Sequence, residues 1–532
     1  MEGKAISNLN FDLFIAGGGI NGAALARLAI TQGLSTGLAE ASDFGSGASS
    51  NTSKLVHGGL RYLESRDFGL VRDAVLERSH LLSLAPHLVK PTRFLFPICS
   101  LGRHGRWATK AGMFLYDALA GRSGMQHHDY VPAADLRKLE PDFLPQESSS
   151  AYAYGDCTMD DARLNLETIL DAENKGAKIW NYHRITNLET SGNGWEVILE
   201  DRKTGREKIL QARRIALTLG PWTDQFFKNV LSEKTSRVRL SQGSHLIMAG
   251  IPSKSCFILP VPKSKRYFFV IPFRGLHLVG TTETELNGDP GDAVWITENE
   301  KKELLSLIRR YFPHAHPRIV TTFSGIRPLA TGGGNTITLS REHVFHQPRP
   351  GLFSVVGGKY TTHRVLARDF LCFILGKKKK EILLSEEPFP GSPGVGGMPA
   401  IRKRLESLNV GNSQAWDRWM NTYGRRAIDL AEYIAVKSDR QKPLSMEMGL
   451  YAGEVTFSQE YEHSQNPVDF FRRRTGLYFD QDAGLGVLDE VQKLMAPNQG
   501  QSHPFWGEEG DYRALLRRHG HQALSSREGN PL

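Results

Sequence analysis

Residues 11–22 of the chain read FDLFIAGGGING, an apolar run followed by a glycine-rich turn. The apolar run has the composition of a buried parallel strand, and residues 23–30 continue in the Ala- and Leu-rich pattern of a helix. Gly17, Gly19 and Gly22 have the spacing of a dinucleotide-binding turn, whose glycines permit a tight bend and a close approach of the backbone to a pyrophosphate. The helix that follows directs N–H groups at the phosphates. The segment therefore predicts a nucleotide-binding strand, turn and helix.

An acidic residue beyond this turn indicates which kind of nucleotide binds, because it would contact the ribose. Residues 35–39 predict a second short strand, and Glu40 follows it, twenty-three residues after Gly17. A carboxylate at this position accepts hydrogen bonds from ribose hydroxyl groups and disfavours a 2′-phosphate. The cofactor is therefore predicted to be FAD or NAD and not NADP. An ordinary glycine-rich turn is the plainer interpretation, but strand, helix and spaced acid together argue for a nucleotide.

The loop after Glu40 favours FAD over NAD. Residues 49–54 carry hydroxyl and amide groups, and with residues 55–63 they could follow an extended FAD as far as its ribityl chain. An NAD enzyme would continue with another plain crossover helix. From composition alone, a solvated Ser-rich loop remains the competing interpretation.

The composition limits the classes of protein to consider. A chain of 532 residues is too long to fold around one hydrophobic core, so two or three domains are expected. No stretch reaches the roughly 20 continuous apolar residues of a spanning helix, and residues 1–10 lack the apolar region of a signal peptide. The formal charge of +9 favours an anionic substrate or an anionic membrane surface, and no nucleic-acid-binding motif is present. The four cysteines lack the paired spacing of a metal site, so we expect reduced thiols and no metal.

Periodicity predicts most of the remaining elements. Helical spacing of apolar residues covers 67–84 and 297–312, and a buried strand is expected over 352–356. The short β-rich runs of residues 176–282 predict one mixed sheet, forming a second domain above a substrate cavity. A basic run and a Gly- and Pro-rich stretch then indicate a linker, followed by a charged helical region and by a polar end that we expect to fray in part.

A longer match begins at residues 52–64, which read TSKLVHGGLRYLE. This segment closely resembles the signature of the FAD-dependent glycerol-3-phosphate dehydrogenases. The resemblance continues in the expected order over nearly all of residues 11–375, through the motifs DDARL (160–164), GPW (220–222), GSH (243–245), GTT (280–282), SGIRPL (324–329) and GGKYTT (357–362). Glu283 departs from the family pattern, which commonly has Asp there, and Thr218-Leu219 replace Ala-Thr before Gly220. Neither change removes a charged site group, so we expect small shifts near the flavin.

The resemblance implies an α/β fold with three parts: a Rossmann-type FAD-binding domain, a mixed-sheet substrate domain like that of amino-acid and glycine oxidases, and a small all-α C-terminal domain. Residues 1–385 would form the FAD-dependent oxidoreductase region. Its FAD-binding parts would be about 11–100, 150–225 and 325–375, interleaved with substrate-binding parts about 101–149 and 226–324. A linker (386–399), a helical domain (400–495) and a polar tail (496–532) would follow. Residues 470–477, FFRRRTGL, resemble the C-terminal domain of the family.

The resemblance also implies the cofactor and substrate residues. FAD is expected against Gly17, Gly19, Asn21, Gly22, Glu40, Ser49, Ser50, Thr52, Ser53, Lys54, Leu55, His57, Gly58, Gly59, Gly220, Trp222, Gly357, Gly358, Lys359, Thr361 and Thr362. The substrate is expected among Arg61, Tyr62, His245, Arg327, Arg341 and Lys359, because a phosphate needs fixed cations. Of these, His245, Arg327, Lys359 and Arg61 are expected to be catalytic, with His245 as the base or as the group that orients the hydroxyl. The pair Asp160-Asp161 indicates a helix N-terminus.

The implied reaction is the oxidation of sn-glycerol 3-phosphate to dihydroxyacetone phosphate by hydride transfer to flavin N5. Electrons would pass to membrane quinone, from a cytoplasmic protein held peripherally on the inner face of the cell membrane, and a homodimer is one option for its assembly. Basic segments at residues 377–380 and 470–474 are candidates for contact with the anionic membrane surface. The alternatives are an oxygen-using glycerophosphate oxidase, an amine or amino-acid oxidase on the same fold, and a catalytically silent flavoprotein.

Overall fold

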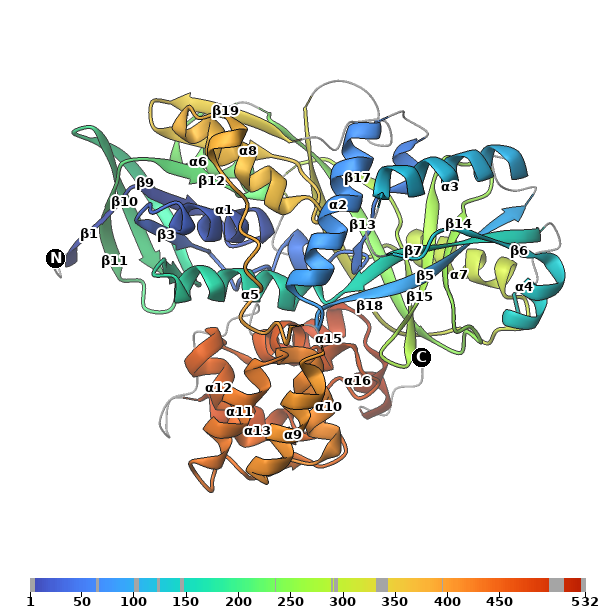
Figure 1. Ribbon diagram of the computed structural model, residues 1–532. Coiled ribbons are helices and arrows are strands. Elements are labelled where there is room, and N and C mark those ends of the chain that lie inside the picture. Colours follow the sequence, from blue (N-terminus) through green and yellow to red (C-terminus); the bar gives the residue numbers. More distant parts are fainter. Residues whose placement is uncertain are drawn as a thin grey trace.

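The computed structural model describes residues 5–63, 67–99, 105–121, 125–143, 148–234, 236–288, 290, 295–331, 343–394, 396–496 and 511–527 (Figure 1). Three parts are distinguishable. In the view of Figure 1, a sheet with its covering helices lies to the left, a larger sheet lies to the right, and the C-terminal helices lie below both. This is the expected α/β architecture with a helical C-terminal part.

The nucleotide-binding part is built on a six-stranded sheet. Its strands follow the order β19 (Val344–Arg349), β20 (Leu352–Val356), β12 (Ile215–Leu217), β2 (Leu13–Ala16), β3 (Thr36–Ala39) and β8 (Lys178–Trp180). All neighbours are parallel except the edge pair β19–β20. On one face, Leu13 and Ile15 pack with helices α1 (Ile20–Thr31), α5 (Asp161–Asn174) and α8 (His363–Leu375). The other face also packs against protein, which explains why β2 is apolar at every position.

A smaller sheet covers that second face. It has four strands in the order β1 (Ala5–Phe11), β11 (Glu207–Ala212), β10 (Gly194–Asp201) and β9 (His183–Ser191). The buried parallel strand predicted over residues 11–16 is confirmed as β2 at residues 13–16, but its predicted start is wrong, because Phe11 ends β1 in the smaller sheet. Asp12 interrupts the apolar run: the Asp12 carboxylate accepts hydrogen bonds from the N–H and hydroxyl of Ser35. Helix α6 (Thr223–Val230) packs beside this layer through Phe227.

The large sheet has ten strands. Eight follow the order β17 (Thr284–Leu286), β13 (Val238–Ala249), β16 (Leu276–Gly280), β15 (Tyr267–Phe273), β14 (Cys256–Pro260), β5 (Val89–Cys99), β7 (Ser148–Met159) and β4 (Leu55–Val56), while β18 (Arg318–Ala330) pairs with β13 and β6 (Asp129–Pro132) with β7. Helix α7 (Glu298–Tyr311) packs on one face together with α4 (Ala133–Leu139). Helices α2 (Phe68–Leu84) and α3 (Arg106–Ala120) contribute to the core on the other face.

The single mixed sheet predicted over residues 176–282 is also wrong. Its strands are divided among the three sheets: β8 and β12 belong to the six-stranded sheet, β9–β11 to the four-stranded sheet, and β13–β16 to the ten-stranded sheet. Strands β5 and β7 also lie in the ten-stranded sheet, and the expectation that residues 11–100 and 150–225 bind FAD stays a prediction. Periodicity identifies a strand without identifying its neighbours, which come here from distant parts of the chain.

The C-terminal part consists of helices and one short hairpin. The helices are α9 (Met398–Leu408), α10 (Ser413–Tyr423), α11 (Arg426–Ala435), α12 (Ala452–Glu462) and α13 (Leu488–Met495), and the hairpin joins β21 (Pro443–Ser445) to β22 (Leu450–Tyr451). A π-helical turn, η5 (Asp469–Arg474), precedes a 3-10 turn, η6 (Leu477–Phe479). Other 3-10 turns are η1 (Ala48–Ser50), η2 (Leu60–Leu63), η3 (Gly220–Trp222) and η4 (Lys379–Glu381).

Residues expected as a polar tail include two packed helices, α15 (Tyr512–Arg518) and α16 (Gln522–Arg527). Tyr512 and Leu516 are buried, and the carbonyl oxygen of His519 accepts hydrogen bonds from the N–H (3.2 Å) and hydroxyl (3.0 Å) of Thr322 on β18. A few apolar residues at helical spacing are enough to fix this polar segment on the large sheet. Across the described part of the chain, no helix combines the length and the apolar character needed to cross a membrane.

Candidate active site

The glycine turn leaves no room for side chains. Gly17 has φ +104°, and a Cβ on Gly22 would lie 2.0 Å from the carbonyl oxygen of Gly17. Helix α1 begins at Ile20, inside the motif and earlier than predicted, so its N-terminus belongs to the turn. Helix α1 is described throughout and has no acidic residue in its first turn. The turn therefore combines close backbone approach with the positive end of a helix dipole, as a pyrophosphate requires.

Glu40 follows strand β3 and lies against this turn. Its carboxylate accepts hydrogen bonds from the backbone N–H of Gly18 at 2.7 Å and of Ser42 at 2.9 Å. Burial raises the pKa of Glu40, although both backbone donors act to lower it. Each carboxylate oxygen can accept a further hydrogen bond, so the position suits the hydroxyl groups of a ribose.

Two buried polar atoms near the turn have no hydrogen-bond partner among the described residues. They are Oδ1 of Asn21 and Oγ of Ser50. Unsatisfied buried polar atoms are rare and often mark the position of a ligand or an ordered water. With the glycine cradle and Glu40, these atoms fit a bound FAD.

The remaining residues predicted to bind FAD come from four further segments. These are η1 and the following loop (Ser49, Ser50, Thr52, Ser53, Lys54), β4 with the turn after it (Leu55, His57, Gly58, Gly59), η3 (Gly220, Trp222), and the turn between β20 and α8 (Gly357, Gly358, Lys359, Thr361, Thr362). Direct hydrogen bonds join several of them: the Ile20 N–H donates to Ser49 Oγ at 2.9 Å, and Asn21 Nδ2 donates to the Gly357 carbonyl at 3.3 Å. Turn η1 and the turn between β20 and α8 therefore meet at the N-terminus of α1, and the contact of each residue with FAD stays a prediction.

Asp161 holds the segment that leads to the substrate side. Its carboxylate accepts hydrogen bonds from the Thr52 hydroxyl at 2.7 Å and from the Lys54 ammonium at 2.6 Å. Asp160 caps helix α5 by accepting a hydrogen bond from the Arg163 N–H, which is the role predicted for the pair at the helix N-terminus. Asp161 lies in the first turn of the same helix and also anchors Thr52 and Lys54. Between the two anchored residues, Ser53 lies with its Oγ 2.9 Å from His245 Nε2.

His245 and Arg327 lie on the same face of the antiparallel ribbon formed by β13 and β18. His245 faces Phe323 and Ser241 faces Arg327 across the ribbon, and two glycines, Gly243 and Gly325, face each other between these pairs. Residues two apart on a strand share a face. The two glycines therefore place no side chain of their own between the imidazole and the guanidinium, and other groups approach the ribbon closely there.

The surroundings of His245 keep its ring neutral. Its ring stacks on Phe323 with centroids 4.8 Å apart. Burial, with the nearby charges of Arg327 and Lys54, lowers the pKa of His245 to about 3. A neutral imidazole has one lone pair that can accept a proton, and a bound anionic substrate would offset the charges of Arg327 and Lys54 that make this ring a weak base.

Arg327 is oriented by two neighbours. Its Nη2 donates to Thr281 Oγ1 at 3.0 Å, and its Nη1 lies 4.0 Å from the Glu283 carboxylate. A Cβ on Gly243 would lie 2.3 Å from Arg327 Nη2, so the guanidinium occupies space that only glycine leaves open. Because β13 and β18 are described in full, this packing accounts for the glycine in the GSH motif.

Two groups of residues remain to be placed. The side chains of Arg61 and Tyr62, and Arg341 as a whole, lie outside the described residues, so their expected roles stay predictions. Lys359 is half-buried in the turn between β20 and α8. Sequence reasoning missed Thr281 and the anchoring role of Asp161, whose partners are distant in the chain. The only signals available were their places in the GTT and DDARL motifs.

Comparisons with known proteins agree with this geometry. The FAD dependent oxidoreductase family matches residues 12–364, and the C-terminal domain of alpha-glycerophosphate oxidase matches residues 386–504. The fold and the site thus define an FAD-dependent oxidoreductase, and the chain belongs to that family. Within it, the chain belongs to the FAD-dependent glycerol-3-phosphate dehydrogenases, which confirms the resemblance, the fold class and the cofactor.

Individual relatives support this assignment, and solved structures that are less than 25% identical show the same fold. A glycerol-3-phosphate dehydrogenase of Pseudomonas aeruginosa is 34% identical, with 93% of this chain and 96% of the relative covered. A D-erythritol 1-phosphate dehydrogenase of Brucella abortus is 39% identical over 67% of this chain and 72% of its own. The structure of a Bacillus halodurans glycerol-3-phosphate dehydrogenase with FAD has a TM-score of 0.73 at 23% identity, covering 98% of this chain and 95% of that chain. A glycine oxidase from Geobacillus kaustophilus has a TM-score of 0.55 at 16% identity, covering 71% of this chain and 99% of its own, so it shares the fold alone.

Proposed function

We propose that this protein oxidises sn-glycerol 3-phosphate to dihydroxyacetone phosphate with FAD as its cofactor. One observation carries the proposal: a neutral buried imidazole, His245, and a guanidinium, Arg327, share one face of the β13–β18 ribbon with two glycines between them. The substrate has the matching groups, a secondary alcohol that must lose a proton and a phosphate that needs a cation. The activity for which the Pseudomonas aeruginosa relative is named supports the same substrate.

Each residue has a defined task in this proposal. Arg327 binds the phosphate, with Lys359, Arg61 and Arg341 as the further cations that we predict around it. His245 accepts the proton of the C2 hydroxyl, and the Ser53 hydroxyl at 2.9 Å orients its ring. FAD, when bound, supplies at N5 the acceptor for the hydride that leaves C2. The alcohol loses one hydride and one proton, so the ketone is formed without a further reactant.

A spectroscopic experiment tests the proposal. Under anaerobic conditions, glycerol 3-phosphate should bleach the flavin absorbance of the purified holoprotein, and glycerol and glycine should not. Bleaching by an amine or amino acid, with none by glycerol 3-phosphate, would overturn the proposal. Reoxidation of the reduced protein by a quinone analogue compared with air then separates a dehydrogenase from an oxygen-using oxidase.

A second candidate substrate is D-erythritol 1-phosphate. The Brucella abortus relative that bears this name shares 39% identity with the chain over 67% of its length, and D-erythritol 1-phosphate also offers a phosphate to Arg327 and a secondary alcohol to His245. The ratio of kcat/KM for the two phosphates decides between them. A ratio above one for D-erythritol 1-phosphate would make the four-carbon polyol the preferred substrate.

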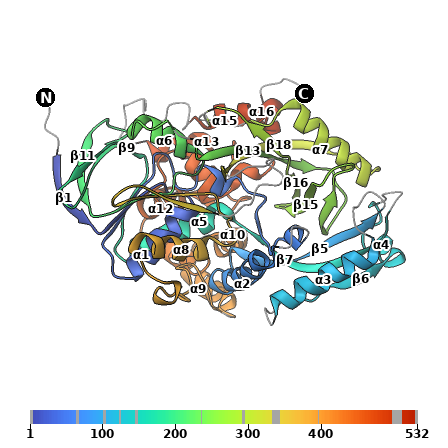
Figure 2. The same cartoon turned by 90° about the horizontal axis from the view of Figure 1, so that it is seen from above.

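We further propose that quinone is the electron acceptor and that helix α3 contacts an anionic membrane. Trp107 is 75% exposed and Phe114 is 69% exposed on one side of α3, whereas Met113 and Tyr116 are buried on the other. Arg106 and Lys110 both lie over the exposed Trp107 ring. Aromatic rings with basic neighbours suit the boundary between headgroups and acyl chains. Figure 2 shows α3, β6 and α4 along one edge of the molecule.

Of the two basic segments first considered for this role, residues 470–474 are unsuitable. Their arginines are buried in the protein and are bound to acidic and amide groups there. Residues 377–380 are exposed, and Lys379 is paired with Asp369 at 2.6 Å. A homodimer and attachment to the inner face of the cell membrane stay predictions.

Vesicle sedimentation tests the membrane contact. Replacing both Trp107 and Phe114 by Ala should abolish binding to vesicles rich in phosphatidylserine, and reduction of a soluble dye should be unchanged. Val436, which is 75% exposed on the C-terminal part, provides the matched control, since Val436→Ala should bind as the wild type does. Equal binding by the double variant and the wild type would rule out α3.

A further inference from the structure

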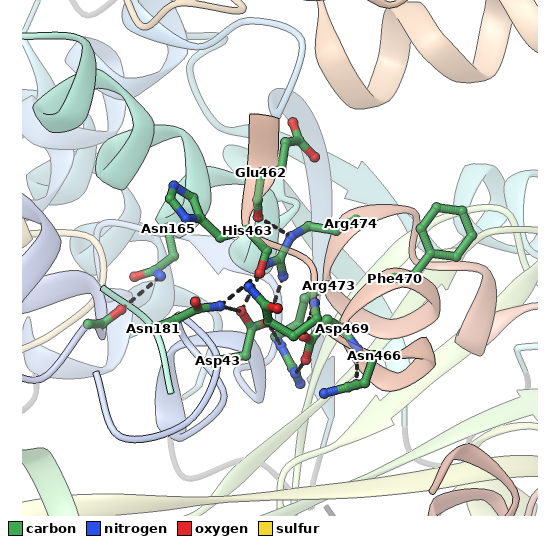
Figure 3. A network of polar contacts seen from close by, with 12 residues as sticks. Asp43, Asn165, Asn181, Glu462, His463, Asn466, Asp469, Phe470, Arg473 and Arg474 are labelled. Atoms are coloured by element: carbon green, nitrogen blue, oxygen red, sulfur yellow. Dashed lines mark hydrogen bonds and ion pairs between the residues drawn. The ribbon is translucent and has the colours of Figure 1, made fainter. Parts of the chain in front are cut away.

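Three consecutive arginines of the C-terminal part are buried in contact with the FAD-binding part. They lie in the π-helical turn η5, and Figure 3 shows Arg473 and Arg474 pointing toward Asp43. Arg474 donates from Nη1 and Nη2 to the Asp43 carboxylate at 2.6 and 2.8 Å, and Arg473 Nε donates to it at 2.5 Å. Arg473 also donates to Asp469 at 2.6 Å. The cluster thus joins two guanidinium groups to two carboxylates, one from each part of the chain.

Asp43 belongs to the loop that surrounds the ribose acid. The Ser42 N–H donates to Glu40, and the Gly45 N–H donates to the Gly18 carbonyl of the glycine turn at 3.1 Å. Asp43 lies between these two donors and is fully buried. Burial alone would raise the pKa of its carboxyl, but Arg474 and Arg473 outweigh this and lower it. The ionised carboxylate is therefore a fixed point between Glu40 and the turn.

Arg472 reaches the second loop of the site. Its Nη2 donates to Asn51 Oδ1 at 2.6 Å, and its guanidinium lies 4.6 Å from the centre of the Tyr478 ring. The backbone of Asn51 packs against β18, where a Cβ on Gly325 would lie 2.6 Å from the Asn51 carbonyl oxygen. Ser53, the partner of His245, follows two residues later. The same arginine run therefore holds both the loop beside the ribose acid and the loop beside the imidazole.

A purely stabilising role would not require this placement. Buried ion pairs contribute little net stability compared with well-packed apolar side chains. The C-terminal part also contains another buried pair, Arg418 with Glu454, which joins α10 to α12 and contacts neither loop. Contact with the two cofactor loops is what distinguishes Arg472, Arg473 and Arg474 from that pair.

We propose that Arg472, Arg473 and Arg474 are positioning residues of the flavin site, through which the C-terminal part sets both FAD affinity and the placement of Ser53 and His245. Arg473 and Arg474 act through Asp43 on the loop beside Glu40. Arg472 acts through Asn51 on the loop beside His245. The proposal thus has two arms. The first arm, through Asp43, rests on FAD binding alone, and the second arm, through Asn51, also rests on the proposed oxidation of glycerol 3-phosphate.

The first experiment measures FAD affinity by fluorescence titration of apoprotein and the melting temperature of the same samples. Arg474→Met should raise the Kd for FAD about tenfold or more. Arg418→Met should lower the melting temperature at least as much and leave the Kd within threefold of the wild type. The double variant Asp43→Asn, Arg474→Met leaves no unpaired charge, and it should fold and still bind FAD weakly. A wild-type Kd in the double variant, or an equal rise in Arg418→Met, would overturn the first arm.

The second experiment separates Arg472 from its neighbours. Arg472→Met should keep the Kd for FAD within threefold, and the rate constant for anaerobic flavin reduction by saturating glycerol 3-phosphate should fall about tenfold. Arg472→Lys, which retains a donor for Asn51, should recover part of that loss. Unchanged reduction in Arg472→Met would overturn the second arm. If wild-type protein itself is not reduced by glycerol 3-phosphate, the proposed substrate is wrong, and the FAD affinities still decide the first arm.

Discussion

The chemistry proposed for His245 depends on the charge state of its ring. Burial, Arg327 and Lys54 lower the pKa of His245 to about 3 in the folded protein, whereas the unfolded chain binds this proton near pH 6.5. Below about pH 6.5 the unfolded state therefore takes up a proton that the folded state excludes. The free energy of unfolding is unaffected by this group above pH 6.5 and falls as the pH decreases toward 3.

We expect His245→Gln to remove this pH dependence. Between pH 7 and pH 5, the wild type should lose about 2 kcal/mol of unfolding free energy more than the variant. Urea denaturation at the two pH values measures the difference. An equal loss in both proteins would mean that the ring is protonated at an ordinary pKa, and that burial and the two cations do not keep it neutral.

A substitution of Arg327 tests the proposed contact with the substrate phosphate. Arg327→Ala should reduce kcat/KM for glycerol 3-phosphate about 100-fold, as the loss of a charge-assisted contact worth about 3 kcal/mol implies. FAD should remain bound, because Thr281 and Glu283 orient Arg327 and neither is a predicted FAD residue. Arg184→Ala removes a half-exposed arginine paired with Glu200 on the four-stranded sheet, and it should change neither quantity. Loss of FAD with unchanged KM would contradict the assignment.

Single residues differ in how well the sequence predicts them. Glu40 was predictable because its role depends on local spacing from the glycine turn. Asp161 was not, since its partners Thr52 and Lys54 lie more than a hundred residues away and its own pattern matches a common helix N-terminus. Arg327 and His245 were expected only from the family resemblance, and their shared face depends on the pairing of β13 with β18.

At the scale of elements, the β13–β18 ribbon is the part that assembles the proposed chemistry. Its register brings Gly243 opposite Gly325, so that the Arg327 guanidinium and Thr281 Oγ1 pack over Gly243 while Asn51 packs closely on the other glycine. Each glycine therefore has a separate steric reason. Gly243 makes room for the guanidinium, and Gly325 makes room for the loop that carries Ser53.

The steric reason for Gly243 leads to a prediction. Gly243→Ala places a methyl group 2.3 Å from Arg327 Nη2, so the guanidinium must move. We expect kcat/KM for glycerol 3-phosphate to fall by about tenfold to a hundredfold, with FAD affinity retained. Gly69→Ala is the matched control, because a Cβ there meets nothing within 4 Å and the residue lies in helix α2. Equal activity of Gly243→Ala and the wild type would show that the position of the guanidinium is not limiting.

Most helices and strands were predictable from sequence, and most of their neighbours were not. The strand at 352–356 and the helices near 67–84 and 297–312 are confirmed within one residue at each end. The arginine run at 472–474 has the composition of a solvated or membrane-facing surface, yet it is buried. Its partners, Asp43 and Asn51, are more than 400 residues away in the sequence. The charge of the segment did not predict its burial, because burial depends on partners that are distant in the sequence.

For the whole molecule, a second buried ion cluster fastens the C-terminal helices to the nucleotide-binding part. Glu462 at the end of α12 accepts hydrogen bonds from Arg163 on α5 at 2.7 Å and from Arg426 on α11 at 2.6 Å. Burial would raise the pKa of Glu462, but Arg163 and Arg426 outweigh it and lower the pKa to about 2. The stability that Glu462 contributes is therefore present above about pH 4.5 and is lost as the pH falls toward 2.

We predict that this loss can be isolated in a variant. Between pH 5 and pH 2.5, the unfolding free energy of the wild type should fall by roughly 2 to 3 kcal/mol more than that of Glu462→Gln. Urea titrations followed by tryptophan fluorescence report the change, since Trp416 and Trp419 lie in α10. Glu406→Gln removes an exposed partner of Arg402 and should behave as the wild type. The same acid dependence in Glu462→Gln would show that another group is responsible.

The contact between Asp43 and the arginines also sets an order of events during synthesis. Arg473 and Arg474 follow Asp43 by 430 and 431 residues, so at about 5–20 residues per second a ribosome delivers them roughly 20 to 90 s later. Throughout that interval, the loop beside Glu40 must keep its carboxylate in water or bind a temporary counterion. We therefore expect a nascent chain halted before the arginine run to capture FAD poorly. Loading of the cofactor would then follow the synthesis of the arginine run.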